Sequence, residues 1–377
     1  MTAIVGAHET PYARHPAEGT DTTGVLAAAV AGALADAGIG QGEVDGLGVA
    51  SFSLVPDHAI DLAWRLGLRV RWLMDDANGG ASAVDMLQHA VRAIEAGDAE
   101  TIVLCAGDHL DRAAFRRLVE EYNRATAEHL TPLGYTGPNA LFAMVTQRWL
   151  AARGLDRAAL GAIPVAQRAW AAGNSAAVYR EPLTMEEYLA SPFVAEPLTR
   201  YDCVPVVTGA DAIVVTGAPA GGRPHVRVRA IAALHNPDHQ QGPGFGEGFN
   251  DVAQRLWPLA GVRPEDVDAA FLYDDYPVVV AVQAEELGLV PGGDVERWLR
   301  VDVLERGQAL NTSGGQLSAG QAGAAGGMHG LVEAVRQLRG EATGRQADVS
   351  LAVVGGYGMV LLRHGACHNA AVLERVA

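Results

Sequence analysis

The residues best suited to chemistry lie in a glycine-rich stretch from Asn311 to Gly330 (NTSGGQLSAGQAGAAGGMHG). Its polar and glycine residues suit a turn, and the apolar residues that follow recur at helical spacing. A glycine loop that opens a helix gathers unpaired N–H groups at the positive end of the helix dipole. Such a loop suits an anion or a developing oxyanion, with Gly315 and Gly320 as candidate backbone donors. The alternative is a tight loop whose small residues only permit close packing.

A second candidate segment, YDDY at 273–276, follows the apolar stretch 269–272 and precedes a helix expected over 278–287. The end of a strand in an α/β fold is a usual place for site residues. The Tyr273 hydroxyl could donate to an oxyanion or exchange a proton, provided that its pKa falls below the usual value of about 10. The alternative is that Tyr273 and Tyr276 cap the helix and fill the core.

Tyr357 is a third candidate, because it stands among the glycines of the segment GGYG at 355–358. We expect this segment to form a turn between two strands, so ordinary turn packing is the alternative. The histidines show no metal-ligand spacing, so no zinc or iron site is predicted. No phosphate-loop or dinucleotide fingerprint occurs, and no bound cofactor is expected.

Composition narrows the class of protein. The chain has 377 residues, 49% of them hydrophobic, which is enough for two similar domains or one large α/β unit. A net charge of −16 argues against nucleic acid or an anionic membrane as a ligand. No apolar run of about 18 residues occurs, so no membrane span is predicted. The N-terminus lacks the pattern of a secretory signal, and three distant cysteines indicate reduced thiols in a cytoplasmic protein.

Strands and helices alternate in the first half of the chain, which predicts a doubly wound parallel sheet. The expected strands cover 2–6, 44–49, 70–74 and 101–106, and the expected helices cover 22–37, 57–66 and 81–96. The alternation lapses over 108–200, which we interpret as an inserted loop domain. The segment 333–358 repeats the helix, turn and strand of 89–108. We therefore predict two α/β halves, 1–218 and 221–377, with a boundary near 218–223.

The glycine-rich stretch resembles the catalytic loop of the thiolase superfamily, most of all its sterol-carrier-protein and lipid-transfer-protein branch. The family pattern is Asn-x-x-Gly-Gly, five residues, then Gly-His-Pro-x-Gly-Ala-x-Gly. It is matched here by Asn311, Gly314, Gly315, Gly320, Ala325 and Gly327. The resemblance implies a thiolase-like fold, in which two duplicated α/β halves form five layers, α-β-α-β-α, with an inserted loop domain.

The same resemblance shows where this chain departs from the family. The nucleophilic cysteine falls on Gly80, so no thiolate can form there. The catalytic histidine falls on Gln321, and a second cysteine, expected near Val354, is also missing. Tyr273 takes the place of the Asn or His that helps to build the oxyanion hole. The resemblance thus implies Tyr273, Tyr357, Asn311 and Gln321 as catalytic candidates, with Gly80 and Gly355 as further backbone donors.

The steroid side-chain aldolases of the lipid-transfer branch also keep this fold without its cysteine and carry a tyrosine in the strand-end motif. They also carry a tyrosine in the glycine loop, where this chain has Gln321, and they work with an OB-fold partner protein. The resemblance therefore implies a coenzyme A thioester as substrate, a retro-aldol reaction or its reverse, and a similar partner. A homodimer paired through an edge strand of the first half is also expected.

Two other functions stay open. The chain could be a non-catalytic thiolase-fold subunit of an acyl-CoA enzyme complex, because the thiolase thiol and histidine are both absent. It could also be an atypical acyltransferase that uses Ser82 or another group as its nucleophile.

Overall fold

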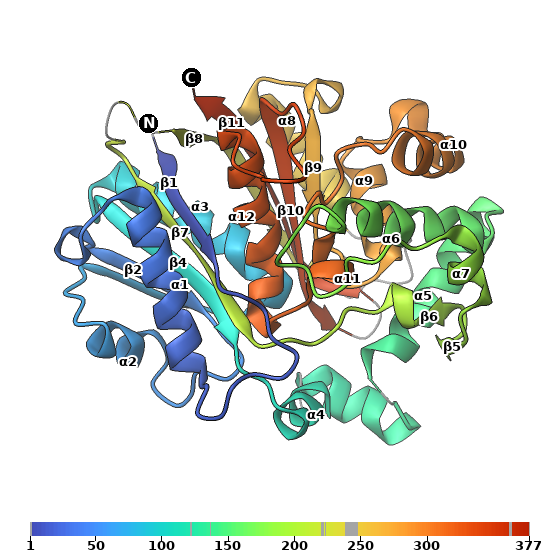
Figure 1. Ribbon diagram of the computed structural model, residues 1–377, viewed down its shortest axis with the longest axis horizontal. Coiled ribbons are helices and arrows are strands. Elements are labelled where there is room, and N and C mark those ends of the chain that lie inside the picture. The colour runs from blue at the N-terminus through green and yellow to red at the C-terminus, as the bar shows by residue number, and fades with distance from the viewer. Residues whose placement is uncertain are drawn as a thin grey trace.

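The computed structural model describes residues 2–120, 123–135, 137–219, 222, 224–237, 248–361 and 364–376. The predicted boundary near 218–223 lies partly outside these residues. The strands of the main sheet are β1 (Ala3–Glu9), β2 (Gly46–Ala50), β3 (Trp72–Asp76), β4 (Thr101–Asp108), β7 (Gly209–Thr216), β8 (His225–His235), β9 (Ala269–Leu272), β10 (Leu351–Leu361) and β11 (His364–Val376). They form one nine-stranded sheet in the order β3-β2-β4-β7-β1-β8-β11-β10-β9 (Figure 1).

The helices expected over 22–37, 57–66, 81–96 and 278–287 are found within one residue of those bounds. The α-helices of the structure are α1 (Thr22–Ala37), α2 (His58–Arg65), α3 (Ser82–Ala96), α4 (Arg112–Glu120), α5 (Pro138–Arg153), α6 (Arg157–Ala171), α7 (Met185–Ala190), α8 (Phe249–Ala260), α9 (Pro277–Glu286), α10 (Val295–Arg297), α11 (Gly315–Ala319) and α12 (Gly326–Arg339). The Asp21 side chain caps α1, and left-handed glycines end α1, α3 and α12. In the part of the chain that the structure describes, no helix is both long and apolar enough to cross a membrane.

The prediction of an all-parallel sheet is wrong. Only β2 with β3, β2 with β4, and β9 with β10 run parallel among the described strand pairs, and the others are antiparallel. The chain returns from the long segment 109–208 as β7, which enters between β4 and β1 in the opposite direction. Strands β10 and β11 follow each other closely in sequence, which favours antiparallel pairing.

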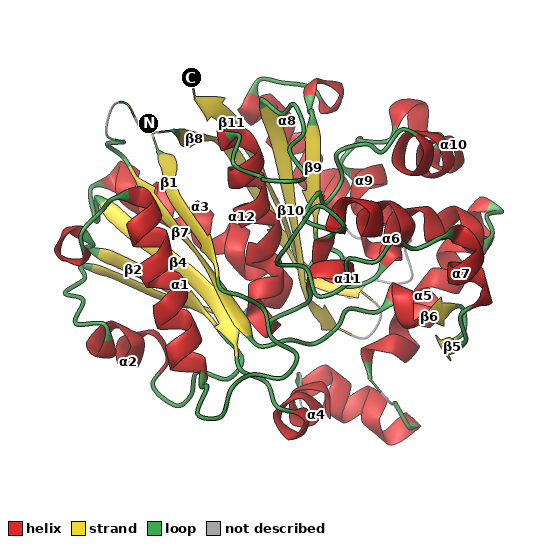
Figure 2. Ribbon diagram, viewed as in Figure 1, coloured by secondary structure: helices red, strands yellow, loops and turns green. Residues whose placement is uncertain are grey.

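The two glycine-opened helices, α3 and α12, lie against each other and against strands of both ends of the sheet (Figure 2). Helix α1 packs on β1, β4 and β7, and α8 packs on β8 and β11. The contact between the central helices needs small residues, since a Cβ at Gly327 would lie 2.4 Å from the Gly80 carbonyl oxygen. The duplication of two halves and the five-layer order remain predictions.

The segment predicted as an inserted loop domain forms helices α4 to α7 and a small separate sheet of β5 (Phe193–Ala195) and β6 (Leu198–Thr199). Its helices α5 and α6 pack on α9, and α6 also packs on α11 (Figure 1). The insertion therefore sits beside both candidate site segments, the strand end after β9 and the glycine loop around α11.

Candidate active site

A cavity of about 320 Å³ lies between the inserted segment and the residues that follow β9. Most of its wall is apolar and includes Phe52, Phe115, Leu118, Leu141, Phe142 and Val204. Three polar residues share that wall with Gly80: Tyr273 and Asp275, which can transfer protons, and Gln321, which can donate hydrogen bonds. An apolar pocket with a few converging polar groups is the usual form of a small-molecule site.

These three polar side chains form one hydrogen-bonded cluster. The Gln321 amide Nε2 donates to the Tyr273 hydroxyl oxygen at 3.1 Å and also to an Asp275 carboxylate oxygen. The Tyr273 hydroxyl in turn donates to Asp275. Burial raises the pKa of Asp275 to about 7, although the hydrogen bonds from Tyr273 and Gln321 oppose the shift. The Asp275 carboxyl can therefore exchange a proton near neutral pH.

The Tyr273 ring fills the space beside Gly80, the position that the family resemblance aligns with the thiolase nucleophile. A Cβ at Gly80 would lie 2.1 Å from Tyr273 Cε2 and 2.4 Å from the Tyr357 carbonyl oxygen. Gly80 belongs to the short turn Gly79–Ala81 that leads into α3. The observed position of Tyr273 therefore requires glycine at 80, and a larger side chain there would have to displace both the Tyr273 ring and the Tyr357 backbone.

Asn311 braces the strand end and does not line the cavity. Its amide Nδ2 donates to the Leu272 carbonyl oxygen at 2.9 Å, and its Oδ1 accepts from the Leu272 N–H at 2.8 Å. The side chain thus acts as a strand partner at the end of β9. We assign it the task of fixing the backbone from which Tyr273 projects.

The N-terminal end of α11 is occupied by a carboxylate of the protein itself. Asp274 accepts from the Gln316 N–H at 3.1 Å and from the Leu317 N–H at 3.4 Å. Gly315 has a φ of 58°, and a Cβ there would lie 2.0 Å from Asp274 Oδ2. Gln316 Oε1 then accepts from Gln321 Nε2 at 3.2 Å. The glycine loop therefore binds Asp274 and thereby holds Gln321 toward Tyr273.

The other glycine candidates also lie off the cavity wall. The Gly320 N–H donates to the Gln316 carbonyl oxygen at 3.0 Å. Gly320 has a φ of 117°, and a Cβ there would lie 2.9 Å from Val207 Cγ1. Gly355 lies inside β10, opposite Leu272 and Ala370. Of the four glycines considered as backbone donors, only Gly80 is among the described residues that line the cavity.

Tyr357 lies within β10, so the expected turn at 355–358 is wrong. The strand continues through these glycines because β11 pairs with it, with Tyr357 opposite His368. The Tyr357 ring stacks near the Tyr273 ring, with centroids 6.4 Å apart, and its hydroxyl accepts from the Gly365 N–H at 2.7 Å. Tyr357 is 3% exposed, so it supports the Tyr273 ring from within the core.

None of the alternative nucleophiles considered is activated for attack. Burial raises the pKa of each cysteine thiol, Cys105, Cys203 and Cys367, to about 12, although Cys203 lines the cavity. A thiol that stays protonated is a poor nucleophile. The Ser82 hydroxyl is buried and has no hydrogen-bond partner among the described residues, so no base activates it there.

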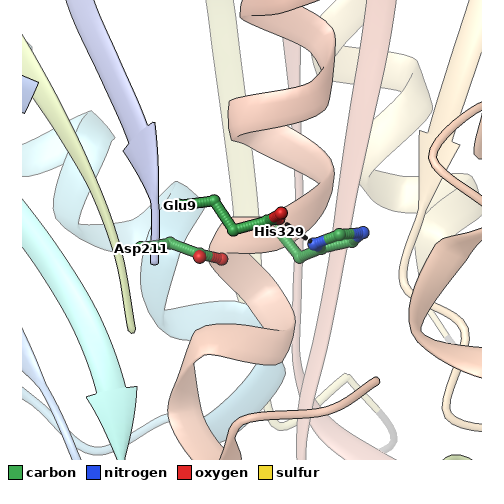
Figure 3. A group of neighbouring side chains, drawn as sticks. All are labelled: Glu9, Asp211 and His329. Atoms are coloured by element: carbon green, nitrogen blue, oxygen red, sulfur yellow. Dashed lines mark ion pairs between the residues drawn. The ribbon is translucent and has the colours of Figure 1, made fainter. Parts of the chain in front are cut away.

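A second buried polar cluster joins β1, β7 and α12 through Glu9, Asp211 and His329 (Figure 3). Their ligand atoms lie within 4.8 Å of one another, a spacing that a metal ion could use. His329 Nδ1 lies 2.7 Å from Glu9 Oε2, and Arg336 lies 3.6 Å from Glu9. Burial alone would lower the pKa of His329, but the Glu9 carboxylate raises it to about 9. The close contact of His329 with Glu9, beside Arg336, is that of an ion pair, and we interpret the cluster as a tie between α12 and the sheet.

Sequence reasoning overlooked the two aspartates that follow Tyr273. The pair stands in the segment at 273–276 that the sequence had singled out, so a strand-end acidic pair was the available signal. Only the fold separates their roles, because Asp274 turns to the glycine loop and Asp275 faces the cavity.

Comparison with known proteins places the chain in a family. Residues 237–374 match the family model described as thiolase C-terminal domain-like. The chain is 33% identical to the Mycobacterium tuberculosis protein named 17-hydroxy-3-oxo-4-pregnene-20-carboxyl-CoA lyase, over 94% of this chain and 95% of that protein. It is 30% identical to the steroid side-chain-cleaving aldolase of Thermomonospora curvata, over 93% of this chain and 94% of that protein.

Solved structures agree with this placement. A chain of the Ltp2-ChsH2(DUF35) aldolase superposes with a TM-score of 0.84 at 28% identity, covering 99% of this chain and 97% of that chain. An acetyl-CoA acetyltransferase from Syntrophomonas wolfei superposes with a TM-score of 0.72 at 14% identity, covering 99% and 98% of the two chains, which shows the shared fold. The chain therefore belongs to the thiolase superfamily, in its sterol-carrier-protein and lipid-transfer-protein branch.

Proposed function

We propose that this protein is an acyl-CoA aldolase, which cleaves or forms a C–C bond of a β-hydroxyacyl-CoA without a cysteine acyl-enzyme. The observation that carries the proposal is the Tyr273–Asp275–Gln321 cluster on the wall of an apolar cavity that Gly80 also lines. The family resemblance aligns Gly80 with the thiolase nucleophile. The names of the two full-length relatives, a CoA lyase and an aldolase, support the same class of reaction.

The cluster supplies the proton transfers of a retro-aldol reaction. Tyr273 takes the proton of the substrate β-hydroxyl while its own proton passes to Asp275, to which it is hydrogen-bonded. The Cα–Cβ bond then breaks, the β-carbon leaves as a carbonyl compound, and the electron pair forms the enolate of the CoA thioester. The same proton returns from Asp275 through Tyr273 to the enolate carbon, so the reaction needs no cofactor. Bond formation is the reverse sequence.

Charge that develops during these steps needs hydrogen-bond donors. The Gln321 amide donates to the Tyr273 oxygen, which stabilises negative charge as the phenol proton leaves. The Gly80 backbone lines the same cavity and is our candidate donor to the enolate oxygen. In this proposal Tyr357 and Asn311 support Tyr273, while Gly315, Gly320 and Gly355 shape the loop and the strand around it.

Replacing Tyr273 by phenylalanine tests the proposal. Loss of a placed acid or base costs about 10²–10⁴ in rate, so Tyr273→Phe should abolish most cleavage of 3-hydroxyacyl-CoA thioesters. Tyr276→Phe is the matched comparison, because Tyr276 lines the same cavity but donates to Asn139 at 2.7 Å instead of Asp275. That variant should lose much less of kcat. Full activity of Tyr273→Phe would contradict the proposed mechanism.

A partner protein belongs in the same assay. The similar structure is named Ltp2-ChsH2(DUF35) aldolase, and we propose a DUF35-type partner for this chain, in line with the OB-fold partner that the resemblance implies. We also propose a cytoplasmic homodimer whose protomers each contain two repeated halves, 1–218 and 221–377. Wild-type protein that cleaves neither hydroxyacyl nor ketoacyl thioesters, even with its partner, would favour the non-catalytic alternative.

A further inference from the structure

Three arginines and two tyrosines alternate beside the glycine loop, in an arrangement that we call the arginine–tyrosine ladder. The Arg14 guanidinium lies 5.7 Å from the centroid of the Tyr179 ring, and Arg168 lies 5.1 Å from the same centroid. Arg168 also lies 5.8 Å from the centroid of Tyr201, and Arg200 lies 4.6 Å from it. The aromatic faces thus hold three like charges close together.

Arg168 is the buried member of the ladder. It is 8% exposed, and its Nε donates to Ser318 Oγ at 3.1 Å, which fixes the guanidinium against α11. Its two terminal nitrogens have no hydrogen-bond partner among the described residues. Arg14 and Arg200 are exposed, so the ladder reaches the surface on both sides of this anchor.

The ladder has no carboxylate of its own. None of its arginines forms an ion pair within the described part of the chain. Burial lowers the pKa of Arg168, and no carboxylate is among the groups that act on it. The adjacent Asp202 is turned inward, where it accepts from the Tyr188 hydroxyl at 2.7 Å.

Two other arginines of this acidic chain whose side chains are little exposed are paired with carboxylates. Arg345 lies 2.7 Å from Glu333, and Arg339 lies 2.7 Å from Asp36. The chain has a net charge of −16, yet no carboxylate of its described part forms an ion pair with an arginine of the ladder. A guanidinium held flat by aromatic rings, with free terminal N–H groups, matches the geometry of phosphate recognition.

We propose that the arginine–tyrosine ladder binds a phosphate group, with Arg168 as the fixed contact and Arg14 and Arg200 as exposed contacts. Residues shortly after Tyr201, beginning with Cys203, line the active-site cavity, so a ligand on the ladder lies near that cavity. The phosphate could come from the nucleotide end of a coenzyme A thioester or from a separate phosphorylated ligand.

Calorimetric titration of the full-length protein with three probes tests the proposal: coenzyme A, adenosine 3′,5′-bisphosphate and inorganic pyrophosphate. Loss of one charge-assisted contact should weaken binding roughly 10- to 100-fold, so Arg168→Gln should show this effect and Arg200→Gln a smaller one. Arg263→Gln is the control, because Arg263 is exposed and paired with Asp266 at 3.2 Å. It should leave binding unchanged.

The outcomes separate the sources of the phosphate. Ladder-dependent binding of coenzyme A and the bisphosphate assigns the site to the nucleotide end of the substrate, and this arm alone rests on the proposed function. Ladder-dependent binding of pyrophosphate only assigns it to another phosphorylated ligand. The proposal is overturned if the wild type binds no probe, or if both ladder variants bind as tightly as the wild type. Should Arg168→Gln fail to fold, the exposed double variant Arg14→Gln/Arg200→Gln decides, and no turnover is needed for any measurement.

Discussion

A cysteine placed at Gly80, the position that the family resemblance aligns with the thiolase nucleophile, should destabilise the fold and should not introduce thiolase chemistry. A Cβ at Gly80 would lie 2.1 Å from Tyr273 Cε2, whereas carbon atoms pack well at about 3.5–4.0 Å. The Tyr273 ring would have to move by more than about 1 Å, out of its hydrogen bonds with Asp275 and Gln321. The second contact, 2.4 Å to the Tyr357 carbonyl oxygen, involves backbone of β10 that is paired with β11.

The expected loss follows from these two contacts. Overpacking a closed core costs about 1–3 kcal/mol, and two violated contacts place Gly80→Cys and Gly80→Ala near the upper end, about 3 kcal/mol. One kcal/mol shifts Tm by about 2–4 °C in domains of 150–250 residues and somewhat less in longer chains, so we expect a fall of about 5 °C. Thermal unfolding followed by circular dichroism measures it.

Two comparisons make the test specific. Gly42→Ala should leave Tm nearly unchanged, because a Cβ at Gly42 would meet no atom within 4 Å. In a Tyr273→Ala background, Gly80→Cys should cost less but still be destabilising, because the contact with the Tyr357 carbonyl oxygen remains. If Gly80→Cys is as stable as Gly42→Ala, or if it forms an acyl-enzyme with an acyl-CoA, the steric reasoning is wrong.

Four further predictions follow from the contacts described above. Asp275→Asn should lower kcat/KM at least ~10²-fold and remove a pH inflection near 7, where the wild-type rate falls as acid protonates the Asp275 base; pH–rate profiles measure both. The ion pair of Glu9 and His329 makes its full contribution to the free energy of unfolding between about pH 4.5 and 6.5, because the pKa of Glu9 is lowered and that of His329 is raised in the folded protein. Since the raised pKa of His329 is about 9, wild-type unfolding free energy should decrease as pH rises from 6.5 through 9, and His329→Gln should not show this decrease in urea titrations. The strand of the first half that lies at the sheet edge is β3, since β4, the strand over 101–106, is buried between β2 and β7. Leu73→Lys on β3 should therefore shift the expected dimer toward monomer in light scattering. A variant without thiols should keep C–C cleavage within about tenfold in the same thioester assay, because each thiol has a raised pKa; the three changes are Cys105→Ser, Cys203→Ser and Cys367→Ser.

The sequence by itself indicated the family, predicted that a thiolase nucleophile is missing, and named two members of the candidate cluster, Tyr273 and Gln321. Each of these is a local pattern of residue types. The loop could be predicted because its backbone restricts which residue types it accepts. Gly314, Gly315 and Gly320 have positive φ, which residues with side chains rarely adopt, so glycine appears in the sequence at these positions. Tyr273 could be predicted as a site residue because it directly follows an apolar strand. Several helices could be predicted from their apolar periodicity.

Only the tertiary structure decided which of these residues meet. Gln321 reaches Tyr273 and Asp275 across 48 and 46 positions of sequence, and Asn311 reaches Leu272 across 39. Strand direction was likewise set by pairing between distant segments, which is why a parallel sheet was predicted and a mixed one is found. Residue types fix what a side chain can donate or accept, but its partner is chosen by segments that the fold brings together, and no local pattern records that choice.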